Sequence, residues 1–191
     1  MSVTADSPPE DTATVAPPQR FTPVSRLLHW LTAILIFSAL FIGFVMVNST
    51  GDYATLLAVH KVLGVLILIV VVVRIVNRLT HRAPALPTTV SRLERLAIAG
   101  SELALYGLLL AQPLIGWAMV SASGTPIVLF GSLHLPAIAP VNLTVFGVLR
   151  DAHSVLAYLL VVLIAAHIAA VLMHTIALGD GMLRRMTFGK H

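Results

Sequence analysis

Apolar residues occupy four long stretches of the chain, and polar, charged or proline-rich segments separate them. The first stretch carries no charge over residues 27–47, and these 21 residues suffice to cross the roughly 30 Å of hydrocarbon in a bilayer. The others are of similar length and end at basic or turn-forming residues. The pattern predicts an all-α membrane protein, a bundle of four transmembrane helices at about 24–47, 54–79, 96–120 and 152–178.

The segments outside these spans define the remaining organisation. Residues 1–19 are polar and rich in proline, which predicts a disordered cytoplasmic tail before the bundle domain, residues 20–186; residues 187–191 form a C-terminal tail. Thr22 followed by Pro23 is typical of a helix start. The uncharged connection 121–149 contains three prolines and three glycines. We expect it to cap the bundle, with short interfacial helices.

Composition supports this class. The chain is 58% apolar and 10% charged, whereas a soluble domain is about 25% charged. The absence of cysteine excludes disulfides, iron–sulfur ligation and thiol catalysis. The isoelectric point near 10.1 does not indicate nucleic-acid binding, because the basic residues flank the apolar spans. Their placement is explained by the orientation of the spans in the membrane.

The basic residues divide unequally between the two sides of the membrane. With four spans, only Lys61 and Arg150 fall on the side opposite the termini. Cytoplasmic segments carry the excess of positive charge, so both termini are expected in the cytoplasm of a bacterium, with the bundle in its inner membrane. The residues on the terminal side are Arg20, Arg26, Arg74, Arg78, Arg82, Arg92, Arg95, Arg184, Arg185 and Lys190.

Histidines within the apolar spans are the candidate ligands. His153 and His167 are 14 residues apart on the last span, which places them on nearly one helix face about 21 Å apart. The depths implied by the topology pair His60 with His153 near the outer face and His29 with His167 near the inner face. Two imidazoles from facing helices, at two levels, favour two bis-histidine b haems. Structural zinc would need further ligands, and a proton relay would more often include carboxylates.

The same 14-residue step marks further positions. It leads from His29 to Gly43, which leaves room at the outer level, and from His60 to Arg74, a natural partner for an inner haem carboxylate. Gly64, one turn after His60, also leaves room for a flat ring. The alternatives are ordinary helix packing for the glycines and snorkelling to the interface for Arg74.

These residues resemble the bacterial cytochrome b561 family, small four-helix di-haem cytochromes. The resemblance covers about residues 20–186 and lies in RLLHWLTAILI, VHKVLGVLILIVVVVRIVNRL, YGLLLAQPLIGWAMVSASGTPIVLFG and AHSVLAYLLVVLIAAHIAAVLMH followed by LRRM. It implies haem ligation by the same four histidines. It also implies either a superoxide:quinone oxidoreductase or a cytochrome subunit that relays electrons between quinone and a partner dehydrogenase or hydrogenase.

The first of these functions is our expectation, with ubiquinone as acceptor. Lys61 adjoins His60, Arg150 lies close to His153, and both would attract a small anion such as superoxide; pairing with haem carboxylates is their alternative role. Glu102 is a candidate proton carrier for quinone reduction or simply an interfacial carboxylate. His174 is expected at the cytoplasmic interface, with a haem carboxylate as its alternative partner. A third class, a non-redox transporter or metal-handling bundle, would bind no haem.

Overall fold

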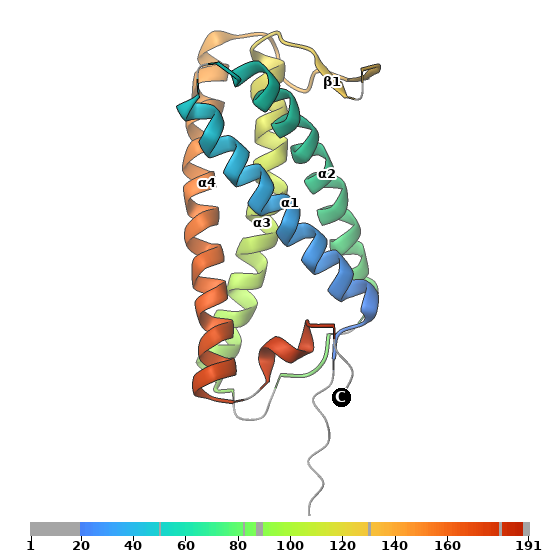
Figure 1. Cartoon of the computed structure of the whole chain (residues 1–191), viewed down its shortest axis with the longest axis vertical. Coiled ribbons are helices and arrows are strands. Elements are labelled where there is room, and N and C mark those ends of the chain that lie inside the picture. Colours follow the sequence, from blue (N-terminus) through green and yellow to red (C-terminus); the bar gives the residue numbers. More distant parts are fainter. Residues whose placement is uncertain are drawn as a thin grey trace, which may run out of the picture.

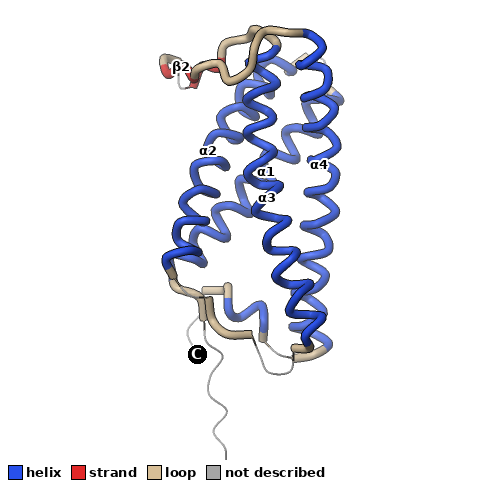
Figure 2. The backbone as a smooth tube through the Cα atoms, turned by 180° about the vertical axis from the view of Figure 1, so that it is seen from behind, coloured by secondary structure: helices blue, strands red, loops and turns tan. Residues whose placement is uncertain are grey.

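The computed structural model describes residues 20–49, 51–81, 83–86, 90–129, 131–179 and 181–188. Four long helices dominate it (Figures 1 and 2), and each is long and apolar enough to cross a membrane. The expected all-α four-helix membrane bundle is therefore confirmed, while the predicted tail at 1–19 lies outside the described residues. The helices are α1 (Pro23–Asn48), α2 (Tyr53–Thr80), α3 (Arg92–Ala122) and α4 (Leu143–Leu172).

Local sequence signals set the helix starts at the end of the bundle where α1 begins and α2 ends, which we call the terminal end. The hydroxyl of Thr22 accepts a hydrogen bond from the backbone N–H of Ser25, and Pro23 is the first residue of α1. At the start of α3, Ser91 and Glu94 form a reciprocal capping box. These contacts satisfy backbone donors that a helix start leaves free.

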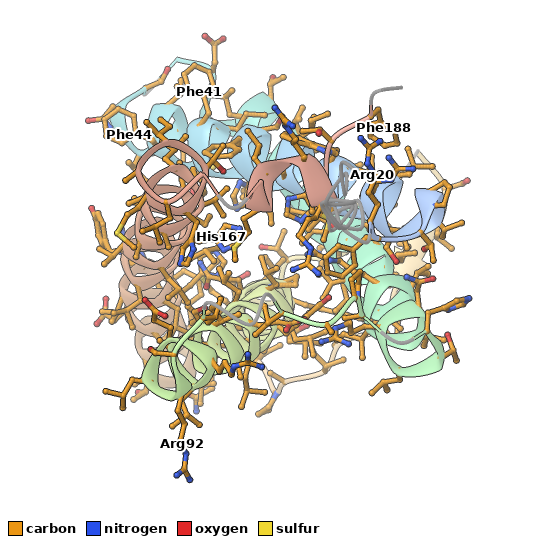
Figure 3. All side chains as sticks on the ribbon, turned by 90° about the horizontal axis from the view of Figure 1, so that it is seen from below. Arg20, Phe41, Phe44, Arg92, His167 and Phe188 are labelled. Carbon is orange, nitrogen blue, oxygen red and sulfur yellow. The ribbon has the colours of Figure 1, made fainter. Side chains whose placement is uncertain are left out.

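The helices pack in chain order, α1 on α2, α2 on α3 and α3 on α4. Their shared core is apolar and includes Ile36, Ile67 and the fully buried Val71. Other apolar side chains face outward: Phe41 is 68% exposed and Phe44 70%, and both point away from the bundle in Figure 3. An apolar exterior around fully hydrogen-bonded helices is what a lipid environment requires.

The connection between α3 and α4 differs from the expected interfacial helices. It forms a two-stranded antiparallel hairpin, β1 (Ile127–Leu129) and β2 (Leu133–Leu135), at the end of the bundle opposite the start of α1 (Figure 1). Gly131 lies in the turn with a positive φ of 78°, a conformation open to glycine at little cost. We call this the hairpin end.

α4 also begins earlier than expected, at Leu143 rather than near residue 152. The side chain of Asn142 accepts a hydrogen bond from the backbone N–H of Val145 at 3.0 Å and caps the helix. Gly147, one of the three glycines of the expected connection, lies inside the first turns of α4. A well-placed cap thus outweighs one unfavourable helix residue.

At the terminal end, the chain after α4 folds back under the bundle (Figures 1 and 2). A π-helical turn, η1 (Met173–Ala177), leads to a short 3₁₀ helix, η2 (Met182–Arg185). Trp30 donates its indole N–H to the carbonyl of Met186 at 2.9 Å. Arg26 donates to the carbonyl of Thr187 at 2.9 Å, and Arg185 to that of Ala85 at 2.6 Å. The segment is therefore tied to both α1 and the α2–α3 connection.

Asn142→Ala should lower the free energy of unfolding by about 1 kcal/mol, because alanine cannot cap α4. Thermal unfolding of the purified protein in detergent measures the loss. Ser154→Ala removes an exposed hydroxyl from the same helix and should stay within about 0.5 kcal/mol of the parent. Equal effects of the two substitutions would contradict the capping role.

Candidate functional site

Two pairs of histidines face each other across the bundle, one near each end. The hairpin-end pair consists of His60 on α2 and His153 on α4, whose ring centroids are 6.2 Å apart with an interplanar angle of 80°. Nδ1 of each imidazole is buried and has no hydrogen-bond partner in the described part of the chain. An unpaired buried nitrogen costs free energy in apolar surroundings. We therefore expect these imidazoles to gain a partner, either a bound ligand or a further hydrogen bond.

Two glycines lie directly against this pair. A Cβ added at Gly43 on α1 would lie 3.3 Å from Cε1 of His60, and one added at Gly116 on α3 would lie 3.2 Å from Cε1 of His153. Each imidazole therefore rests against a helix backbone from which the side chain is missing. At Gly64, by contrast, an added Cβ meets nothing within 4 Å, so open space adjoins the backbone one turn after His60.

The terminal-end pair consists of His29 on α1 and His167 on α4, with ring centroids 6.4 Å apart and planes inclined at 52°. His167 points into the bundle in the view from below (Figure 3). Nη2 of Arg74 lies 3.0 Å from Nδ1 of His29, and its guanidinium lies 5.2 Å from the ring centroid of Tyr106. A cation is thus in contact with this pair.

The spacing of both pairs fits two axial ligands of one metal. Metal–imidazole nitrogen bonds are about 2 Å long, so two rings on opposite sides of a metal hold their centroids roughly 6 Å apart. α4 carries one ligand of each pair and packs chiefly on α3 rather than on α1 or α2, so the pairs lie where helix backbones stand apart. No group of three or more His, Cys, Asp or Glu suited to a metal ion occurs in the residues described. The donor set therefore fits a metal that brings its own equatorial ligands, as haem iron does.

The contact between Arg74 and His29 has a chemical consequence. A guanidinium only donates hydrogen bonds, so Nδ1 of His29 is the acceptor and a neutral ring carries its proton on Nε2. Binding of a metal through Nε2 would require Arg74 to turn to another acceptor. The haem carboxylate predicted from the sequence is such an acceptor, and Arg74 stands beside the pair that would need it.

The predicted steering residues are half-buried Lys61, next to His60, and exposed Arg150, three residues before His153. Neither makes an ion pair within the described ranges. Asp52 and Asp151 are also exposed at this end, so any attraction for anions depends on local placement and not on the net charge.

The other predicted polar residues lie at the terminal end. Glu102 accepts two hydrogen bonds from Arg78, at 2.8 and 3.3 Å, in a half-exposed ion pair, which fits the interfacial role. His174, in η1, is buried with 5% of its surface exposed, so it does not face solvent as an interfacial residue would. His81 and His134 are exposed.

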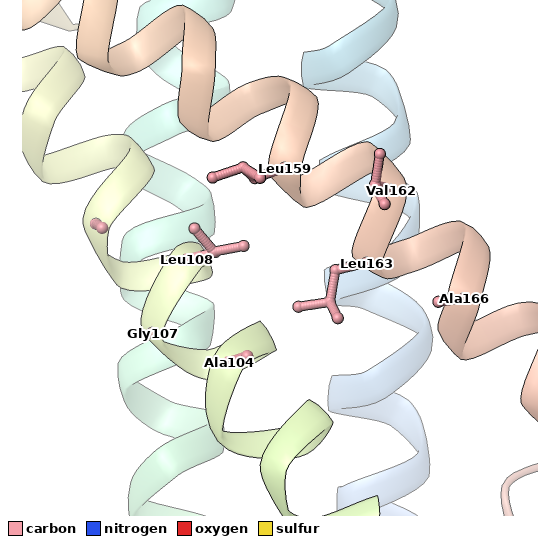
Figure 4. A pocket seen from close by; sticks show the side chains of 8 residues that line it. Ala104, Gly107, Leu108, Leu159, Val162, Leu163 and Ala166 are labelled. Carbon is pink, nitrogen blue, oxygen red and sulfur yellow. The ribbon is translucent and has the colours of Figure 1, made fainter. Parts of the chain in front are cut away.

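A groove of about 560 Å³ lies apart from the histidines, between α3 and α4 (Figure 4). Small and aliphatic side chains line it, among them Ala104, Gly107, Leu163 and Ala166. Without a polar lining group it fits lipid chains and offers no chemistry of its own.

Gly116 is the site residue that sequence reasoning missed. The 14-residue step finds positions only on helices that carry a ligand, and α3 carries none. A signal did exist, because Gly116 lies in IGWAMV at 115–120, which resembles IGFVMV around Gly43 at 42–47.

Comparisons with known proteins agree with this geometry. The model of the family described as prokaryotic cytochrome b561 matches residues 20–189. The chain is 33% identical to cytochrome b561 homolog 2 of Escherichia coli K12 over 176 residues, which are 88% of this chain and 92% of that protein. It is 24% identical to cytochrome b561 homolog 1 of the same organism over 87% of this chain and 96% of that protein. It is 28% identical to a Yersinia pestis protein named probable superoxide oxidase CybB, over 83% of this chain and 90% of that protein.

Alanine at His60 or His153 should remove one b-type pigment, and alanine at His29 or His167 should remove the other, because each pair is predicted to share one metal. Reduced-minus-oxidised spectra and pyridine haemochrome content of the purified variants measure this. His134→Ala, in the exposed hairpin, should retain both pigments. If two members of one pair removed different pigments, the pairing would be wrong.

Proposed function

The chain belongs to the prokaryotic cytochrome b561 family of membrane electron-transfer proteins, which bind haem b, and on that premise we propose that it oxidises superoxide and reduces ubiquinone through two haems. It is a bacterial membrane protein. The observation that carries the proposal is the stacking of two histidine pairs, with centroids 6.2 and 6.4 Å apart, on opposite ends of one bundle.

We take the hairpin end as the outer face and the terminal end as the cytoplasmic face, because ten of twelve basic residues fall on the terminal side. His153 and His167, both on α4, would then hold the two haems, and the two histidines lie about 21 Å apart along the helix. Bound haem supplies reversible one-electron exchange at its iron. The apolar helices between the pairs exclude water and ions from the path.

At the outer face, His60 and His153 would together hold the haem iron, and the protein would then offer dioxygen no open position on the metal. Electron exchange with superoxide therefore occurs without bond formation. Two superoxide anions each lose one electron and leave as dioxygen. Ubiquinone takes up the two electrons and two protons to become ubiquinol, so the reaction balances without a further reductant.

Lys61 and Arg150 support a small anionic donor. They are the only basic residues of the outer side, and each is close in sequence to one histidine of the outer pair. Positive charge beside a redox site raises the encounter rate with anions. The name of the Yersinia pestis relative points to the same donor.

The competing function is a cytochrome subunit that relays electrons between quinone and a partner dehydrogenase or hydrogenase. The bundle fills the described chain and includes no soluble redox domain within it, as would suit such a subunit. A non-redox bundle is the remaining alternative.

One assay separates the three functions. The purified protein in nanodiscs is supplied with enzymatically generated superoxide and a short-chain ubiquinone, and ubiquinol formation is followed by absorbance. We expect formation that superoxide dismutase suppresses. A haem-containing protein that is inert alone and active with a partner dehydrogenase would support the subunit, and a protein without a b-type band would support the non-redox bundle.

Lys61→Gln combined with Arg150→Gln should lower kcat/KM for superoxide about tenfold, because local attraction of the anion is lost. The haem spectrum should be unchanged and the dependence of rate on ionic strength weaker. Arg92→Gln, which removes an exposed cation at the terminal end (Figure 3), serves as the control. Unchanged kcat/KM in the double variant would rule out steering by these residues.

A further inference from the structure

The hairpin-end pair meets α1 and α3 in the same way, and the two glycines lie in similar stretches, IGFVMV at 42–47 and IGWAMV at 115–120. His60 lies against Gly43, and His153 lies against Gly116. The carbonyl four residues before each glycine approaches the same ring: Ala39 approaches His60, and Gln112 approaches His153. The arrangement of glycine, carbonyl and imidazole therefore occurs twice, once on each helix.

Helix geometry explains the spacing of four. In an α-helix the carbonyl of Ala39 accepts the N–H of Gly43, and that of Gln112 accepts the N–H of Gly116. A carbonyl oxygen has two lone pairs, so each can accept one more hydrogen bond. The missing Cβ of the glycine opens the approach to that second lone pair.

The imidazoles supply the matching donors. Nδ1 of His60 and of His153 is buried and makes no hydrogen bond within the described ranges. A histidine that binds a metal through one nitrogen usually donates its other N–H to a carboxylate or backbone carbonyl, which fixes the tautomer and the orientation of the ring.

We propose that the backbone carbonyls of Ala39 and Gln112 orient both axial ligands of the hairpin-end haem, and that Gly43 and Gly116 are positioning residues that give the imidazoles access to them. Each Nδ1–H donates to its carbonyl, which leaves Nε2 for the iron. The inference rests on the proposed function only in requiring that the pair holds haem.

The terminal-end pair is built differently. Of the glycines in the described chain, none would place a Cβ within 4 Å of His29 or His167, and His29 meets the cation of Arg74 instead. Donation to a carbonyl raises the basicity of an imidazole ligand and favours the oxidised metal, whereas a guanidinium accepts no hydrogen bond and cannot raise the basicity in this way. The hairpin-end haem therefore has the lower midpoint potential, and electrons entering there run downhill to the terminal end.

Gly43→Ala and Gly116→Ala test the proposal, with Gly64→Ala and Gly107→Ala as matched controls on α2 and α3, where a Cβ meets nothing within 4 Å. A methyl group at 43 or 116 should push the ring from its carbonyl and raise the lower of two midpoint potentials. We expect the ratio of reduced to oxidised haem at fixed potential to rise about tenfold, which is about 59 mV for a one-electron couple. The higher midpoint potential should stay unchanged in these variants, and both midpoint potentials should stay unchanged in the controls. The ferric EPR signal of one haem should change, because the planes of its imidazole ligands turn.

An unchanged or lowered midpoint in variants that retain haem would overturn the proposal, as would an equal shift in the controls. If a variant loses its haem, the hydrogen bonds are tested in the parent protein instead. Its ferric form should show hyperfine-shifted Nδ1–H proton resonances that exchange slowly with D₂O, and rapid exchange of these protons would overturn the proposal. A parent protein without haem would instead refute the proposed function, so the two failures are distinguishable.

Discussion

Imidazole nitrogens placed among apolar helices cost free energy unless each finds a partner, and much of this bundle is arranged around that constraint. α4 carries one histidine of each pair and stands away from α1 and α2, where its two partners lie. At one end the partners available to the rings are backbone carbonyls beside glycines; at the other end the partner is a guanidinium. The pairs are thus alike in spacing and unlike in electrostatics.

The four spans and the two pairs could be predicted from the sequence because both depend on short-range regularities. Uncharged runs near 20 residues define spans, and a 14-residue interval fixes two histidines on one helix face. The depth of His29 and His60 followed from the topology, and the structure brings each beside the expected partner on α4. Haem ligation by these residues remains a prediction.

What sequence reasoning missed depends on contacts between segments distant in the chain. Gly116 acquires its meaning only when α3 meets the ring of His153, 37 positions later, and no periodicity within α3 indicates that contact. The early start of α4 depends on the balance between two local effects: the Asn142 cap stabilises the helix more than the glycine at 147 destabilises it. Likewise, His174 was assigned to the interface from its distance along the helix, whereas the π-turn and the returning C-terminal segment bury it.

The central claim is that each imidazole pair coordinates the iron of one haem, so that a single bundle binds two haems at different depths. The most direct measurement is the haem-to-polypeptide ratio of the purified protein, from pyridine haemochrome absorbance against quantitative amino-acid analysis, together with the ferric EPR spectrum. The account predicts two haems per chain, both low-spin. A ratio of one or zero, or a high-spin iron with an open axial position, would contradict it.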